Sequence, residues 1–234
     1  MFVCLLLTTS VILKAQTVEK IVSNYINFIG GASNWKKINT IVSSGTYNYG
    51  GMEFPFEAYS KAPNLYKYIV SSNGKSFQQA FDGNQGWKID GFKDETTKTM
   101  LSGKDAKAMA NESDVELESA FINYKQKGYH ALLDGKDSIG NSECYKVKFI
   151  SNTNDTATYY FSTKDFSLLK KQAVSKNEEL DKSMLDTYYS DYTTIEGIKT
   201  PFKIVSKIGD QTILTITIKK FQLNTTVSND IFKP

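Results

Sequence analysis

The chain contains 234 residues, of which 40% are hydrophobic and 23% are charged. This composition is too apolar for an intrinsically disordered chain, and the length suits one large domain or two small ones. Every basic residue is a lysine, and 28 basic against 25 acidic residues give a net charge of +3. The small net charge and the lack of arginine disfavour nucleic-acid binding and phosphoryl transfer, in which the guanidinium fork is the preferred anion ligand.

An apolar run over residues 2–13 opens the chain and is followed by Lys14 and Ala15. About a dozen apolar residues are too few to span a bilayer but suit the hydrophobic part of a signal peptide. Ala15 is a small residue of the kind that precedes a cleavage site. We therefore expect residues 1–15 to be a signal peptide that is cleaved near Ala15. The alternative is a buried N-terminal strand or helix.

The next segment has helical spacing. Between Thr17 and Ile29 the apolar residues recur at intervals of three and four, which predicts an amphipathic helix. Thr17 suits the N-cap position, and the glycine pair Gly30 and Gly31 suits the end of the helix.

From Ile41 the hydrophobic period changes to two, which is typical of strands with two different faces. Ile41, Ser43, Gly45, Tyr47 and Tyr49 fall on one face of the first strand. Four more strands follow at short intervals, up to Ile89. The dipeptides that connect them are typical of tight turns and predict an antiparallel meander: Gly50-Gly51, Asn73-Gly74 and Asp82-Gly83.

Residues 104–124 contain no glycine and no period of two, and they predict one or two amphipathic helices. Strands resume at His130 and continue to Leu223, where the last strand changes its apolar face near Phe221 and so predicts a bulge. About ten or eleven strands without a long linker indicate one domain over residues 16–234. We expect a mainly β protein with a few helices (α+β), built on one large antiparallel sheet that must curl or close.

Signals of catalysis are few. No phosphate-binding loop, nucleophile elbow or zinc-ligand helix occurs in the sequence. One histidine, His130, and one cysteine after the expected cleavage, Cys144, disfavour a metal site and nucleophilic catalysis. We therefore expect a protein without catalytic residues, metal or cofactor. A hydrolase with paired carboxylates stays open as an alternative, because a sequence does not show the distance between two acids.

Aromatic residues are abundant, with 14 phenylalanines, 14 tyrosines and 2 tryptophans. Core packing is the simplest interpretation of any one of them. A curled sheet backed by few helices, however, tends to enclose a cavity, and hydrocarbon burial gains about 0.8 kcal/mol per methylene. The residues that we expect to line an apolar cavity for acyl chains are Tyr47, Tyr49, Met52, Phe54, Phe56, Phe77, Phe81, Trp87 and Phe121.

Several stretches of the sequence together resemble a known family. They include PFEAYSKAPNLYKY (Pro55 to Tyr68), FDGNQGWKI (Phe81 to Ile89), DYTTIEGIKTPFKI (Asp191 to Ile204) and the C-terminal NDIFKP, together with the segment from Tyr124 to Phe149. In their order and spacing these segments resemble the outer-membrane lipoprotein-sorting protein family of diderm bacteria. This family is related to the periplasmic carrier LolA and to the lipid-binding LppX and RseB folds.

The resemblance implies an unclosed β-barrel of about eleven antiparallel strands with helices across its mouth. It further implies a non-catalytic periplasmic carrier or binder whose apolar cavity receives the acyl chains of a lipoprotein or of free lipid. The expected partners are inner- and outer-membrane proteins that load and accept the cargo, and the protein is expected to be a monomer. The alternative is an envelope-stress sensor or adaptor with the same fold, which acts through a protein–protein surface.

Overall fold

The computed structural model of the chain describes residues 16–103, 105–106, 109, 121–151, 154–175, 180 and 182–234. The predicted signal peptide, residues 1–15, lies outside the described residues, as does most of the predicted helical segment 104–124. Within the described end of that segment, residues 121–128 form consecutive turns.

Two helices precede the sheet: α1 (Val18–Phe28) and the short α2 (Ala32–Trp35). The predicted start of α1 is confirmed, since the Thr17 side chain accepts a hydrogen bond from the Lys20 N–H. Its predicted end is confirmed as well, because Gly30 and Gly31 have φ of 111° and 83°. The short helix α2 was not predicted from the sequence. Among the helices that the structure describes, none is long and apolar enough to cross a membrane.

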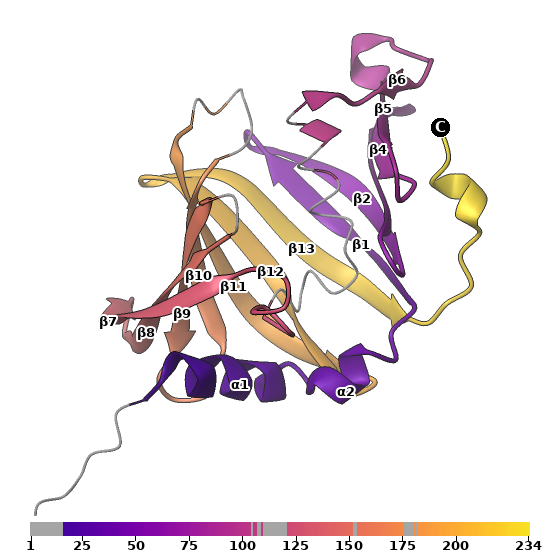
Figure 1. Cartoon of the computed structure of the whole chain (residues 1–234). Coiled ribbons are helices and arrows are strands. Elements are labelled where there is room, and N and C mark those ends of the chain that lie inside the picture. Colours follow the sequence, from indigo (N-terminus) through magenta and orange to yellow (C-terminus); the bar gives the residue numbers. More distant parts are fainter. Residues whose placement is uncertain are drawn as a thin grey trace, which may run out of the picture.

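Thirteen strands form one sheet in which every neighbouring pair is antiparallel, and the sheet is not closed into a barrel (Figure 1). Their order across the sheet is β6-β5-β4-β3-β2-β1-β13-β12-β11-β10-β9-β8-β7. The strands are β1 (Thr40–Tyr49), β2 (Met52–Lys61), β3 (Leu65–Ser72), β4 (Lys75–Phe81), β5 (Gly86–Asp90), β6 (Thr99–Met100), β7 (His130–Ile139), β8 (Ser142–Ile150), β9 (Thr156–Ser162), β10 (Leu168–Val174), β11 (Met184–Ile195), β12 (Ile198–Ile208) and β13 (Gln211–Leu223).

The predicted fold class, a mainly β protein with one large open antiparallel sheet, is confirmed. The described residues form thirteen strands, where about eleven were expected. The edge strand β6 is only two residues long, and a two-residue strand has no periodicity from which to predict it.

Strand β1 lies at the centre of the sheet, between β2 and β13. Tyr47 stands directly opposite Phe54 of β2 and Ile216 of β13, so these three side chains lie on the same face. We call this the inner face, because α1 packs on it, and the opposite one the outer face. The register of β1 against β13 shifts between Ser44 and Gly45, which confirms the predicted bulge.

The hydrophobic core lies where α1 meets the inner face. Ile21, Val22 and Tyr25 of α1 and its C-cap residue Ile29 are buried in it, and each fully buried side chain of this size contributes about 1.5–3 kcal/mol. The residues that complete the buried cluster come from the central strands, from β12 and β8–β10, and from the turns after residue 120; they include Ile41, Phe121, Ile122, Val147, Phe149, Phe161, Leu168, Ile198, Phe221 and Leu223. The helix thus packs against the centre of the sheet and against strands β8–β10.

The C-terminal end of α1 is fixed to the turn between β11 and β12. The Ile29 carbonyl accepts hydrogen bonds from the Trp35 indole N–H at 3.1 Å and from the Lys199 N–H at 3.0 Å. A Cβ on Gly30 would lie 2.1 Å from the Gly197 carbonyl oxygen, so only glycine allows this approach. This anchor sets the position of α1 across the end of the half-barrel (Figure 1).

The segment after β13 runs along the outer face beside β1–β5 (Figure 1). Thr40 and Lys61 donate side-chain hydrogen bonds to the carbonyls of Thr225 and Val227. Val227 and Phe232 are buried. This C-terminal segment therefore covers part of the outer face, which is not available there for a ligand.

Tyr59, on the outer face of β2, donates a hydrogen bond to the Glu57 carboxylate, which raises the pKa of the Tyr59 phenol to about 12. Because the folded pKa lies above the ordinary value of 10.0, this contact stabilises the fold below pH 10 and the contribution is lost as the pH rises toward 12. We expect Glu57→Gln to lower the pKa of Tyr59. A difference titration of tyrosinate absorbance against Tyr59→Phe measures it, and a midpoint unchanged by Glu57→Gln would contradict the assignment.

Candidate ligand-binding face

At the α1 end the inner face is a packed aromatic cluster. The Phe121 ring lies 4.9 Å from the Tyr25 ring, 5.1 Å from the Phe149 ring and 4.9 Å from the Tyr159 ring, all with edge-to-face geometry. Phe121, one of the predicted cavity residues, is 4% exposed. It therefore belongs to the core of the structure as it stands.

Away from α1, the same face carries aromatic and aliphatic side chains that are partly or fully exposed. The register aligns Tyr47 with Phe54, and Tyr49 with Met52. Tyr49 is 40% exposed and Met52 is 62% exposed. Tyr47 stacks on Tyr49 with ring centroids 6.3 Å apart, and partial burial raises the pKa of its phenol. These residues form an apolar surface that is open to a ligand.

The aromatic row continues across β3 and β4. Phe56 stands opposite Val70, which in turn stands opposite Phe77. Phe56 and Phe77 are half-buried, and Phe81, further along β4, is buried. The fold thus brings most of the predicted cavity residues onto one face: Tyr47, Tyr49, Met52, Phe54, Phe56, Phe77 and Phe81.

Trp87 is placed differently. It is 1% exposed and lies on the outer face, where its indole N–H donates to the Phe232 carbonyl at 2.7 Å. The ammonium groups of Lys67 and Lys98 lie 5.2 and 4.5 Å from its ring centroid, and burial together with the charge of Lys98 lowers the pKa of Lys67. The structure therefore does not bring Trp87 together with the other candidates. The sequence pattern gave no sign of this, because Trp87 faces the C-terminal segment, 145 residues away.

Further residues of the inner face were not nominated from the sequence. Phe92, in the short 3-10 helix η1 (Gly91–Lys93), packs 6.0 Å from Phe54 and is 40% exposed. Ile216 and Leu214 of β13 stand opposite Tyr47 and Tyr49. The alternation in β13 was a usable signal for both residues, but no periodicity marks Phe92.

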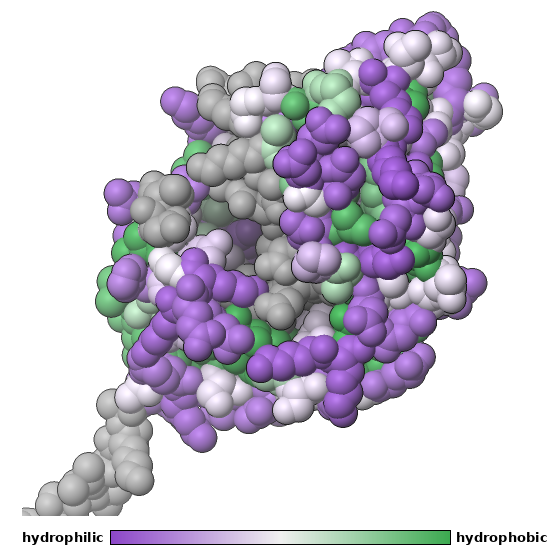
Figure 2. Space-filling view, turned by 45° about the vertical axis from the view of Figure 1, so that its right-hand side comes forward, coloured by the Kyte–Doolittle hydropathy of each residue, from purple (hydrophilic) through white to green (hydrophobic). Residues whose placement is uncertain are grey.

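Figure 2 shows the surface with the side that carries β4–β6 turned forward, and there hydrophobic residues are exposed between hydrophilic ones.

Two grooves are also present. A groove of about 620 Å³ lies between α1 and residues 121–126, with Val22, Ile26 and Tyr124 among its lining residues. Among the described residues the buried Tyr124 hydroxyl has no hydrogen-bond partner, and burial raises the pKa of its phenol. A second groove, of about 650 Å³, is lined mostly by outer-face residues such as Glu57 and Lys219.

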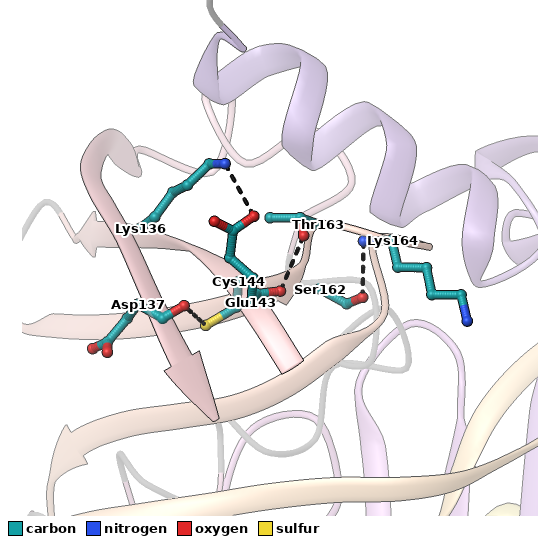
Figure 3. A network of polar contacts seen from close by, with 7 residues as sticks. All are labelled: Lys136, Asp137, Glu143, Cys144, Ser162, Thr163 and Lys164. Atoms are coloured by element: carbon teal, nitrogen blue, oxygen red, sulfur yellow. Dashed lines mark hydrogen bonds and ion pairs between the residues drawn. The ribbon is translucent and has the colours of Figure 1, made fainter. Parts of the chain in front are cut away.

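Cys144 is built into a polar network and does not resemble a nucleophile (Figure 3). Its thiol lies 3.2 Å from the Asp137 carbonyl oxygen, which accepts the hydrogen bond, while the adjacent Glu143 is paired with Lys136 at 3.0 Å. Burial is the main cause that raises the pKa of Cys144. His130 lies opposite Ile150, six residues along β8 from Cys144, which corresponds to about 20 Å along a strand. The two groups therefore cannot form a catalytic pair.

The chain has two cysteines, Cys4 and Cys144. With Cys4 replaced by serine, Cys144 is expected to react with a thiol reagent such as Ellman's reagent only when the sheet opens. The native reaction at neutral pH should be at least about 100-fold slower than in denaturant, because a buried thiol with a raised pKa supplies little accessible thiolate. Stopped-flow absorbance measures both rates. Equal rates would show that the network in Figure 3 does not shield the sulfur.

Other polar groups of the described residues form hydrogen bonds between neighbouring strands. Asp186 accepts hydrogen bonds from Lys170 at 3.3 Å and from Gln172 at 2.8 Å, so its charge is compensated within the outer face. No group of three or more histidine, cysteine or acidic side chains that could hold a metal ion occurs in the described part of the chain.

No protein-family model matches the sequence, and no curated protein matches it either. Solved structures do match. A DUF1329 family protein from Desulfovibrio piger has 13% identity and a TM-score of 0.64, and the match covers 94% of this chain and 98% of that one. A LolA superfamily protein from Nitrosomonas europaea has 12% identity and a TM-score of 0.60, with 94% and 99% of the two chains covered.

The chain has the LolA-type fold. An outer-membrane lipoprotein-sorting protein domain from Vibrio parahaemolyticus also matches, with 9% identity, a TM-score of 0.56 and coverage of 92% of this chain and 95% of that one. The predicted resemblance to the LolA-type group is therefore confirmed at the level of the fold. At these identities the match concerns the half-barrel and its helices, and the chemistry of this chain has to come from its own inner face.

Proposed function

We propose that this protein is a non-catalytic, periplasmic binder or carrier of lipid-modified protein or free lipid. It holds acyl chains against the inner face of its LolA-type half-barrel. The observation that carries the proposal is the aromatic row formed by Tyr47, Phe54, Phe56 and Phe77, which lies on one face and stays partly open. Each methylene that leaves water on such a surface gains about 0.8 kcal/mol, so an acyl chain binds without any polar contact.

The proposal includes export through cleavage near Ala15 and action as a single domain over residues 16–234. Cargo would be loaded at the inner membrane and accepted at the outer membrane by partner proteins, since this chain offers only a surface for binding. The protein would act as a monomer.

Native mass spectrometry of the protein purified after export, followed by the same measurement under denaturing conditions, tests the proposal. We expect lipid or acylated peptide to be bound in the native state and released on denaturation. A lipid-free mass, together with failure to bind added oleate or a synthetic diacyl lipopeptide, would overturn it. A sensor or adaptor that binds a protein partner would then be the better interpretation of the fold.

A further inference from the structure

Beside the aromatic row, the inner face of β3–β5 carries a row of polar side chains. Tyr68, Gln79 and Lys88 stand opposite one another on three successive strands. The register places this polar row one step, or about 7 Å, along the strands from Val70 and Phe77. An apolar surface and a polar one are thus adjacent on the same face, which is the arrangement that an amphipathic ligand requires.

Gln79 and Lys88 of the polar row offer hydrogen-bond donors that no other described residue accepts. The Tyr68 hydroxyl donates to Gln79 Oε1 at 2.7 Å, which orients the Gln79 side chain and leaves its amide NH₂ group to donate. Lys88 is half-buried, and within the described part of the chain its ammonium group has neither an ion pair nor a hydrogen bond. The acid nearest to it along the inner face of β5 is Asp90, which is paired with Lys93 at 3.4 Å.

We infer that Lys88 and Gln79 bind the anionic head group, a phosphate or a carboxylate, of an amphipathic lipid whose acyl chain lies along the half-buried Phe77 and Phe56. This inference rests on the proposed function and assigns the ligand class of the same face. A lysine ammonium is a compact charge that pairs with either anion, and a half-buried site strengthens the attraction relative to bulk water. A neutral lipid gains the apolar contacts but leaves the ammonium group without a counter-ion.

Position distinguishes Lys88 from other lysines on strands. Lys220 of β13 also lacks an ion pair and a hydrogen bond among the described residues, but it is exposed and stands opposite Ser44, away from the aromatic row. Lys220→Gln therefore removes the same charge from the protein at a place where no acyl chain would reach it. It is the matched control for Lys88→Gln.

The test is calorimetric titration of the wild type and both variants with oleate, with monoolein, which is a neutral lipid with the same chain, and with inorganic phosphate. We expect the wild type and Lys220→Gln to bind oleate about tenfold more tightly than monoolein, a typical effect of one charge-assisted contact. Lys88→Gln should lose this preference and bind monoolein within about twofold of the wild type. Circular dichroism confirms that each variant is folded.

The outcomes separate the two proposals. A Lys88→Gln variant that keeps the preference for oleate, or a wild type that binds both lipids equally well, would overturn the head-group site and leave the acyl-chain function standing. Binding of neither lipid would overturn both. Binding of inorganic phosphate that depends on Lys88, without any preference for oleate, would identify a site for the free anion and overturn the lipid assignment.

Discussion

Replacement of Phe54 by glutamate is expected to abolish acyl-chain binding while the half-barrel stays folded. Phe54 lies in the middle of the aromatic row, opposite Tyr47 and 6.0 Å from the Phe92 ring, and it is half-buried. A carboxylate at this point would have to be desolvated by the bound hydrocarbon, which costs several kcal/mol without a partner charge. We expect a loss of affinity for oleate of at least about 100-fold.

The folded state should tolerate this change because, without ligand, a carboxylate at this half-buried position on the open face still reaches water. Phe56→Glu differs, since Phe56 also packs against the buried core, and it should lower stability as well as binding. Thr217→Glu is the matched control. It places the same charge on the outer face of β13, opposite Lys203, and should leave binding unchanged. Unfolding of the Phe54→Glu protein, seen as loss of cooperative thermal melting, would instead show that Phe54 is part of the core.

Gly45→Ala is expected to be the most destabilising small substitution in the central strands. A Cβ at this position would lie 2.0 Å from the Thr217 carbonyl oxygen and 3.0 Å from the Ile218 Cα. Both atoms belong to the backbone of β13, so no side chain can move away to make room. The β1–β13 pair would have to separate at the bulge, and we expect a loss of about 2–4 kcal/mol in the free energy of unfolding.

Chemical denaturation measures this loss. Thr46→Ala is the control. Thr46 is the next residue of β1, and its replacement also leaves an alanine, but on the outer face and without a backbone clash. A Gly45→Ala protein as stable as Thr46→Ala would mean that β1 and β13 are further apart at the bulge than the structure shows.

Much of the fold could be predicted because its elements are regular. The period of three and four in α1 follows from burial of one side of a helix, and the period of two in β1–β5 and β8–β13 follows from a sheet with different faces. Asn73 and Gly74 both have positive φ in the turn between β3 and β4, as the dipeptide predicts. The helix α2 and the strand β6 were not predicted, because four and two residues are too short to show a period.

The candidate face was predictable only in part, because parity within a strand says which residues share a face but not what covers that face. Trp87 and Ile89 share a face of β5, as the period of two predicts, but it is the outer face. The register pairs Trp87 with Ala80 and not with Phe81, which lies on the inner face. Lys88 lies on the inner face by parity but is not apolar, so it was not predicted to line the cavity. Its significance depends on Gln79 and Tyr68, which come from two other strands.

The pairing of β1 with β13 has a consequence for how the chain folds. Hydrogen bonds between Asn39 or Thr40 and the segment after β13 join residues 185 positions apart, and Ile41 stands opposite Leu223. Closing a loop of this length costs about 5 kcal/mol of chain entropy before the contacts form. The central pair, β1 and β13, therefore cannot form until β13 has been synthesised. Because pairing over such a sequence separation is slow, we expect the sheet to be completed late in folding, after the sequential hairpins on either side of it have formed.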